Sequence, residues 1–338
     1  MDAVVFYDND FGFGAFLAAQ MLTGACDFHN MPSFEQLREL SRRFRPSDGT
    51  IHVCGNISHA PTFVAYAGCH RQSHIAIKCL RNFVNLYRLD QTQYAFIRTP
   101  SISLAKPYRR SSIPIHKSGI ALTRKLYATF ARMFPHIQTA VCSVVWQNVP
   151  MFRARVSRNH EEEEPVGNTS NQTSDLHRLD GRHIVYHCYG SAHSSITSAA
   201  IHLNRLPNER RPHVNEIIAL TDYDRSETWQ IGTLNFKGYD TFGNAIYTIG
   251  LGADPYTVKR LLASFLERIG CDTSQLVMQE ALVHINSLAR IGGALSRRYG
   301  FVTLGRIVSA FAIQRQYERL VTFVNDVSNR YGGNKNKA

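Results

Sequence analysis

The chain has 338 residues, 44% of them hydrophobic, so it can bury full cores, and its length predicts two domains of ordinary size. The apolar run 301–313 is interrupted by Arg306 and is too short to span a bilayer, and the N-terminus lacks the basic region of a signal peptide. Seven scattered cysteines without a C-x-x-C pair favour reduced thiols in the cytoplasm over disulfides or structural zinc.

The formal net charge is +12, and residues 1–150 hold most of the excess, with 16 Lys and Arg against 8 Asp and Glu. The densest basic stretch, 106–125, could attract nucleic acid, an anionic membrane surface or an acidic protein. A solvated basic face is the interpretation we favour, because no nucleic-acid-binding motif accompanies the charges. The basic residues of this stretch are Lys106, Arg109, Arg110, Lys117, Arg124 and Lys125.

The first element of the chain is a short apolar strand at 5–7, followed by a glycine-containing turn at 8–14 and an apolar helix at 15–22. The same order returns 180 residues later, between 185 and 202. Four further matches follow in the same order: 49–55 with 232–238, 62–68 with 244–250, 80–83 with 262–265, and 119–125 with 292–298. We therefore predict a tandem duplication.

The duplication sets the predicted domain boundaries. Residues 1–149 form the first copy, and 183–328 form the second copy, which carries the candidate site. Residues 150–182, with an acidic run and low hydrophobicity, form a flexible linker, and 329–338 form a disordered tail. We expect the two copies to pack as an intramolecular pseudo-dimer.

The second copy begins with a predicted buried strand at 184–186. A tight turn follows at Gly190, and from Ser194 or Ser195 the apolar spacing is that of one helix face, with serine as the N-cap. Asp240 and Gly243 predict a hairpin turn, 275–278 a strand and 314–327 a closing helix. His202 is predicted to be packed inside the helix.

Strands that alternate with helices predict an α/β fold in each copy, with a mainly parallel sheet flanked by helices in a Rossmann-like or P-loop-like three-layer sandwich. Ligands of such sheets lie at the carboxyl ends of the strands, where the turn at 187–195 would be placed. The exposed N–H groups and positive dipole of a helix N-terminus suit an anion such as phosphate. The turn lacks the lysine of a P-loop and the glycines of a dinucleotide fingerprint, so we do not predict a nucleoside triphosphatase. The candidate ligand-binding residues are His187, Tyr189, Gly190, Ser191, Ser194, Ser195 and Arg297.

Cys188 and His193 are the candidate catalytic residues, because a histidine near a helix N-terminus can lower the pKa of a cysteine nucleophile. A buried cysteine at the end of a core strand is the alternative. Zinc binding is not predicted, because His187 and Cys188 are adjacent and point apart in an extended backbone. We interpret Asp222 and Asp224 as a solvated turn, with acid/base or cation-binding carboxylates as the alternative. Three arginines, Arg297, Arg298 and Arg306, could close on a phosphate or form the polar face of a helix.

Four stretches, 186–195 (YHCYGSAHSS), 199–207 (AAIHLNRLP), 239–250 and 292–306, resemble an uncharacterised bacterial family, domain-of-unknown-function family 3189 of spore-forming Gram-positive bacteria. The resemblance covers about 182–325 and implies no established reaction or cofactor. The first copy departs from the pattern at the turn, so it is expected to have lost any site there. At the five departing positions Asp8, Gly12, Phe13, Gly14 and Ala15 stand in place of Cys188, Ala192, His193, Ser194 and Ser195.

Two functions from different classes remain open. In the first, the second copy binds a small phosphate-bearing anion and can act on it, while the first copy is structural or regulatory. In the second, the chain is a non-catalytic, sporulation-associated protein that docks a partner or nucleic acid through its basic N-terminal half. Sporulation comes only from the distribution of the family.

Overall fold

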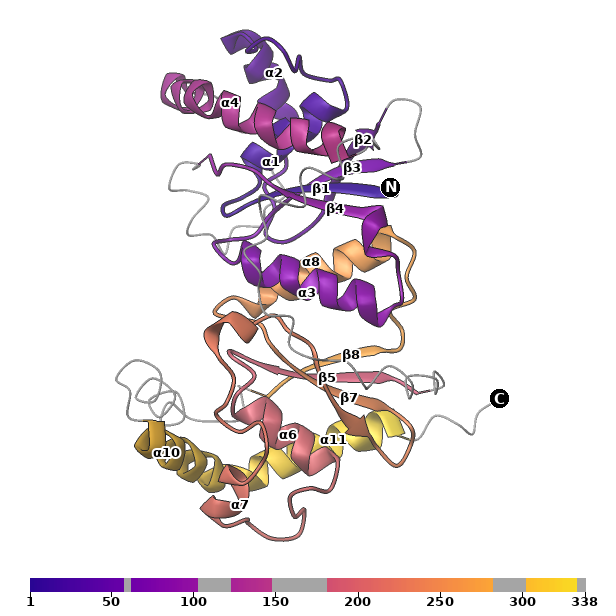
Figure 1. Cartoon of the computed structure of the whole chain (residues 1–338), viewed down its shortest axis with the longest axis vertical. Coiled ribbons are helices and arrows are strands. Elements are labelled where there is room, and N and C mark those ends of the chain that lie inside the picture. Colours follow the sequence, from indigo (N-terminus) through magenta and orange to yellow (C-terminus); the bar gives the residue numbers. More distant parts are fainter. Residues whose placement is uncertain (58–61, 103–122, 148–180, 282–301, 333–338) are drawn as a thin grey trace. The chain divides into compact units, whose positions relative to one another are not determined.

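The computed structural model describes residues 1–57, 62–102, 123–147, 181–281 and 302–332. The chain divides into two compact units, one formed by 1–169 with 256–271 and the other by 170–255 with 272–338. Each unit contains a four-stranded sheet (Figure 1). Several predictions fall wholly or almost wholly outside the described residues, namely the linker, Lys106, Arg109, Arg110, Lys117, Arg297 and Arg298. The predicted disordered tail is wrong for 329–332, which form the end of helix α11 (Tyr317–Gly332), and its remaining residues, 333–338, lie outside the described residues.

The sheet of the first unit has the strand order β2-β3-β1-β4. The two inner strands, β3 and β1, run parallel to each other and to the edge strand β4. The other edge strand, β2, pairs antiparallel with β3. The apolar, β-branched start of β1 explains why this inner strand is buried at every position except Tyr7. The strands are β1 (Ala3–Asp8), β2 (His52–Asn56), β3 (Phe63–Gly68) and β4 (Tyr94–Arg98).

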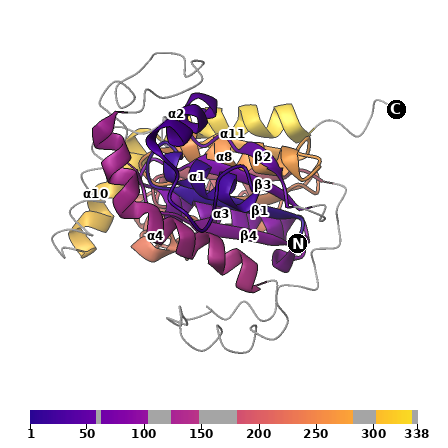
Figure 2. The same ribbon diagram turned by 90° about the horizontal axis from the view of Figure 1, so that it is seen from above.

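Helices α1 and α4 lie over the strands of this sheet when the unit is seen from above (Figure 2). Beneath α1 the ring of Phe16 lies 5.4 Å from that of Phe44 and 5.3 Å from that of Tyr66. Phe265 of α8 packs against Tyr94 and Phe96 of β4, so α8 belongs to the core of this unit. The helical elements are α1 (Phe13–Leu22), α2 (Phe34–Arg43), α3 (Ser73–Leu86), the short 3₁₀ turn η1 (Gln91–Gln93), α4 (Arg124–Gln147) and α8 (Pro255–Arg268).

The second unit repeats this plan with the strand order β6-β7-β5-β8. Helices α6 and α11 pack together, and α6 also contacts β5 and β7 (Figure 1). The strands are β5 (His183–Cys188), β6 (Asn235–Tyr239), β7 (Ala245–Gly250) and β8 (Leu276–Glu280). The helical elements are α6 (Ser194–His202), α7 (Val214–Ile218), η3 (Thr228–Gln230), α10 (Val302–Arg315) and α11 (Tyr317–Gly332).

The two sheets share details that are not required by the fold class alone. Both have one antiparallel edge strand, and this strand carries a register shift at the same place, between Val53 and Gly55 in β2 and between Phe236 and Gly238 in β6. The predicted architecture, two tandem α/β modules with mostly parallel sheets flanked by helices, is therefore confirmed.

Other elements follow the prediction with shifted ends. The predicted hairpin turn joins β6 to β7, where the Asp240 carboxylate accepts hydrogen bonds from the backbone N–H groups of Phe242 and Asn244. The predicted closing helix is α11, which begins and ends later than the pattern indicated. His202 is packed as predicted, and its ring lies within hydrogen-bond distance of the Tyr186 hydroxyl and the Asp240 carboxylate. No helix among the described residues is long and apolar enough to cross a membrane.

Candidate functional site

The turn between β5 and α6 lies at the carboxyl ends of three parallel strands. β5 pairs on one side with β7 and on the other with β8. The turn, which follows the last residue of β5, Cys188, therefore begins between the carboxyl ends of these two neighbouring strands. The helix begins at Ser194, but the N-cap is His193, whose side chain makes no capping hydrogen bond. The predicted serine N-cap is therefore wrong: Ser194 is already the first helical residue, so its hydroxyl is not used as a cap.

The neighbouring strand holds the turn closely. A Cβ atom added to Gly250, at the end of β7, would lie 2.9 Å from the Gly190 carbonyl carbon and 3.0 Å from the Tyr189 oxygen. The Leu251 N–H donates to the Cys188 carbonyl at 2.9 Å. Only a glycine at position 250 leaves room for this close approach of the two backbones.

Two serine hydroxyls of the turn are buried without a hydrogen-bond partner among the described residues. Ser191 and Ser194 are 2% and 1% exposed, and the Oγ atom of each has no partner in the part of the chain that the structure describes. A buried hydroxyl without a partner costs about 1–3 kcal/mol, so two of them in one turn need an explanation. A third hydroxyl, that of Ser195, lies 3.1 Å from the thiol of Cys188.

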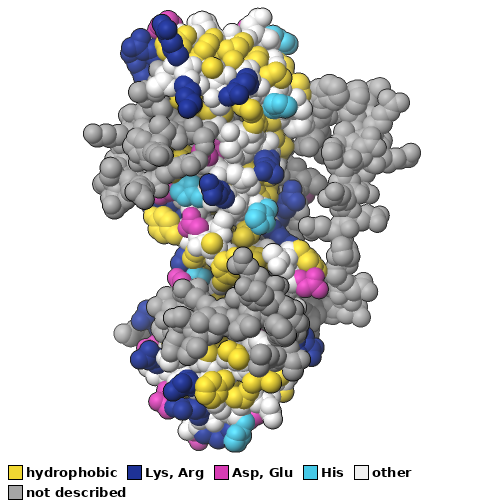
Figure 3. Space-filling view, turned by 90° about the vertical axis from the view of Figure 1, so that its left-hand side faces the viewer, with side chains coloured by type: hydrophobic (Ala, Val, Ile, Leu, Met, Phe, Trp, Pro, Cys, Tyr) yellow, Lys and Arg dark blue, Asp and Glu magenta, His cyan; other side chains and the backbone are white. Residues whose placement is uncertain are grey.

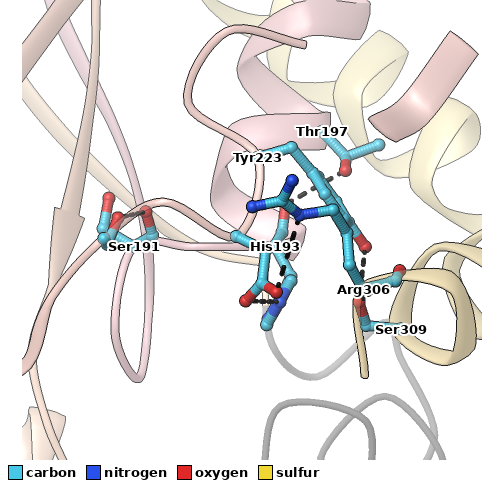
Figure 4. A network of polar contacts seen from close by, with 8 residues as sticks. Ser191, His193, Thr197, Tyr223, Arg306 and Ser309 are labelled. Carbon is cyan, nitrogen blue, oxygen red and sulfur yellow. Dashed lines mark hydrogen bonds and ion pairs between the residues drawn. The ribbon is translucent and has the colours of Figure 1, made fainter. Parts of the chain in front are cut away.

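His193 is held by a carboxylate from another segment of the unit. Its Nε2 lies 2.9 Å from Oδ1 of Asp224, and its ring packs edge-on against Tyr223. The other carboxylate oxygen of Asp224 lies 3.9 Å from Nε of Arg306. Figure 4 shows His193, Tyr223 and Arg306 together, although they come from the turn, the loop after α7 and α10. A buried carboxylate at this distance fixes the orientation of the imidazole ring.

We interpreted Asp222 and Asp224, in the segment 221–225, as parts of a solvated turn, and the structure shows that this is wrong for Asp224. The side chain of Asp222 is half exposed, as a solvated turn requires, but that of Asp224 is 2% exposed. Asp224 has a positive φ of 53°, in the left-handed region, and its side chain is directed into the unit. The burial of Asp224 fits the alternative interpretation, an acid/base or cation-binding carboxylate, and that role remains a prediction.

The first copy places a carboxylate in its own turn. Asp8 stands where the second copy has Cys188, and its side chain is fully buried. Its oxygens accept hydrogen bonds from the backbone N–H groups of Asp10, Gly12 and Gly14, at 2.9, 3.0 and 3.2 Å. Burial raises the pKa of Asp8 to about 7, although the N–H groups of Asp10 and Gly12 oppose that shift. Sequence comparison of the copies showed the replacement, but did not indicate that the carboxylate folds back into the turn.

The remaining predicted residues are placed as follows. His187 is buried within β5, and Tyr189 is half exposed at the start of the turn. Arg124 and Lys125 are exposed in the first turn of α4. Among the described residues, no group of three or more His, Cys, Asp or Glu side chains is placed to hold a metal ion. On the face drawn in Figure 3, the visible Lys and Arg side chains are spread between other side chains. Docking of a partner through the basic stretch 106–125 remains a prediction.

Residues 183–329 match the model of a family described as "Protein of unknown function (DUF3189)", which confirms the resemblance of the C-terminal half. No curated protein and no solved structure matches the chain.

Proposed function

We propose that the second unit binds a small phosphate-bearing anion in the turn between β5 and α6, and that His193 acts on the bound anion. The observation that carries this proposal is the Asp8 carboxylate of the first copy. It occupies the corresponding turn and accepts hydrogen bonds from three of its backbone N–H groups. The turn of the first copy therefore directs three N–H donors at one acceptor group, and a side chain of the chain itself supplies that group.

The second copy has no such carboxylate, because Cys188 stands at the position of Asp8. The counterparts of the three donors are the N–H groups of Gly190, Ala192 and Ser194. The dipole of α6 adds positive potential at the same point. An external anion would also accept hydrogen bonds from Ser191 and Ser194, whose buried hydroxyls have no partner.

The His193–Asp224 pair supports a chemical role for the site. The His193 ring is partly accessible, with 14% of its side chain exposed, whereas Cys188 is buried and its thiol lies against Ser195. Asp224 orients the ring through Nε2, which leaves Nδ1 to exchange a proton with a ligand. Arg306 brings a positive charge to the same group and would help to neutralise a phosphate. We therefore favour His193 over Cys188 as the reactive group. The cytoplasmic location of the protein remains a separate prediction.

The test is calorimetric titration of the full chain with inorganic phosphate and with p-nitrophenyl phosphate. Ser194→Ala and Ser191→Ala should each weaken binding by about tenfold, because each removes a hydrogen bond to a charged group. Ser198→Ala is the matched control: Ser198 lies one turn further along α6, is equally buried and also has an unpartnered hydroxyl. Equal binding by Ser194→Ala and the wild type, or no binding at millimolar ligand, would contradict the proposal. In hydrolysis of p-nitrophenyl phosphate, His193 would take a proton from a water molecule that attacks phosphorus, the P–O bond to p-nitrophenolate would break, and inorganic phosphate would be released. His193→Gln should therefore keep phosphate binding and lose this hydrolysis.

A further inference from the structure

A pocket of about 150 Å³ lies beside α6 in the second unit, away from the polar side chains of the turn. Its buried lining is aliphatic and comes from one face of α6, with Ile196, Ala199 and Ala200. Its polar lining comes from three segments, with Arg205 after α6, Thr221 and Asp222 after α7, and Lys237 of β6. The further lining residues are Leu203, Ala219 and Leu220.

The first copy has larger side chains at two of the corresponding helix positions. Phe16 and Gln20 of α1 stand at the positions of Ile196 and Ala200, and both are buried. Phe16 packs against the rings of Phe44 and Tyr66. The second copy therefore has smaller side chains at these two positions of its helix, where the pocket lies.

One cation at this pocket is well placed to hold an anionic group. Lys237 of β6 stands at the position of Cys54 in the first copy, and only 12% of its side chain is exposed. Its ammonium pairs with Asp222, whose side chain is half exposed. A second cation, Arg205, donates a hydrogen bond to the Lys237 carbonyl. Asp222 is free to turn into solvent, so its carboxylate can be exchanged for that of a ligand while Lys237 keeps a partner.

We propose that this pocket binds a small organic carboxylate whose apolar body is about the size of a benzene ring. A cavity of about 150 Å³ lined by aliphatic side chains accommodates benzene. The ring would contact Ile196, Ala199 and Ala200, and the carboxylate would take the place of Asp222 on Lys237. A monoanion fits better than a phosphate dianion, because Asp222 stays close enough to repel additional negative charge. The site is separate from the anion-binding turn.

The test is methyl NMR of the full chain with its isoleucine δ1 methyl groups labelled, during titration with benzoate. Benzoate should shift the Ile196 signal. Ala200→Gln, which restores the side chain of the first copy, should abolish that shift. Lys237→Met should weaken benzoate binding by about tenfold without affecting neutral benzyl alcohol, because it removes a charge-assisted bond and leaves the apolar lining intact. Lys125→Met, at the exposed start of α4, is the charge-matched control.

Three outcomes would overturn the proposal: no shift of Ile196 at millimolar benzoate, an unchanged shift in Ala200→Gln with an unchanged melting temperature, or equal benzoate affinity in Lys237→Met and the wild type. Ser194→Ala distinguishes this site from the anion-binding turn. It should leave benzoate binding intact, so either site can fail its test without affecting the other.

Discussion

Replacing Asp8 by Asn tests how a buried carboxylate behaves in the turn of the first copy. The sign of the pH dependence follows from the raised pKa. Because the folded state holds the proton up to about pH 7 and the unfolded state only up to about 3.8, the folded state binds more protons between these values. The wild type should therefore lose stability as pH rises through this window. Between pH 5.5 and 8.5 the loss is about 2 kcal/mol.

The Asp8→Asn variant lacks this titration, so the part of the pH dependence that Asp8 contributes should be absent from it. At pH 5.5 it should be less stable than the wild type, by about 1–3 kcal/mol, because its amide NH₂ group faces the Gly14 N–H and leaves that donor unpaired. The difference between the two proteins should shrink as pH rises. Replacement of the exposed Asp2 by Asn is the control with the same change in charge.

Hydrogen exchange followed by mass spectrometry measures the difference in stability between the wild type and Asp8→Asn in the intact chain. Peptides from β1 and β3 report on the first unit, and peptides from β5 and β7 serve as an internal reference. Comparing wild type and variant at the same pH cancels the pH dependence of intrinsic exchange. If the two proteins differ by the same amount at pH 5.5 and at pH 8.5, the pKa of Asp8 is not raised and the reasoning fails.

Three further predictions concern single contacts. Gly250→Ala should weaken phosphate binding in the second unit, because its Cβ would lie 2.9 Å from Gly190; unchanged affinity in calorimetry would show that the turn tolerates a shift. Burial opposes ionisation of Asp240, but hydrogen bonds from His202 and Asn244 outweigh it and hold its pKa below the usual value. Asp240→Asn should therefore remove stability that the wild type has at neutral pH and loses on acidification below about pH 4, as followed by urea unfolding at several pH values. Phe265→Ala should destabilise the first unit by about 3–5 kcal/mol and speed exchange in β4, because it removes ring contacts with Tyr94 and Phe96; unchanged β4 exchange would place α8 outside that core.

The sequence predicted the parts of the fold that depend on local pattern. The strand ending at Cys188, the turn and the helix after it follow from apolar runs and glycine, and the repeat of that order predicted two similar modules. The exposure of Asp222 and the burial of Asp224 could not be read from a five-residue segment. They depend on the left-handed backbone at Asp224 and on which loop packs beside it. The sequence did not predict the pocket beside α6, because a cavity depends on how several segments pack and no single residue indicates one. Comparing Phe16 with Ile196 and Gln20 with Ala200 would have indicated it.

The two copies have different side chains packed beside the turn, at position 13 in the first copy and 193 in the second. This difference favours a functional role for the second copy. In the first copy Phe13 packs against Phe44, with ring centroids 5.1 Å apart. In the second copy the counterpart of Phe13 is His193, which packs against Tyr223 and bonds to the buried carboxylate of Asp224. A buried carboxylate must be desolvated, and replacing such a pair by apolar side chains is often neutral or stabilising. Because two phenyl rings suffice for packing in the first copy, stability alone does not account for the His193–Asp224 pair. The pair is better explained by what it can do to a ligand in the adjacent turn.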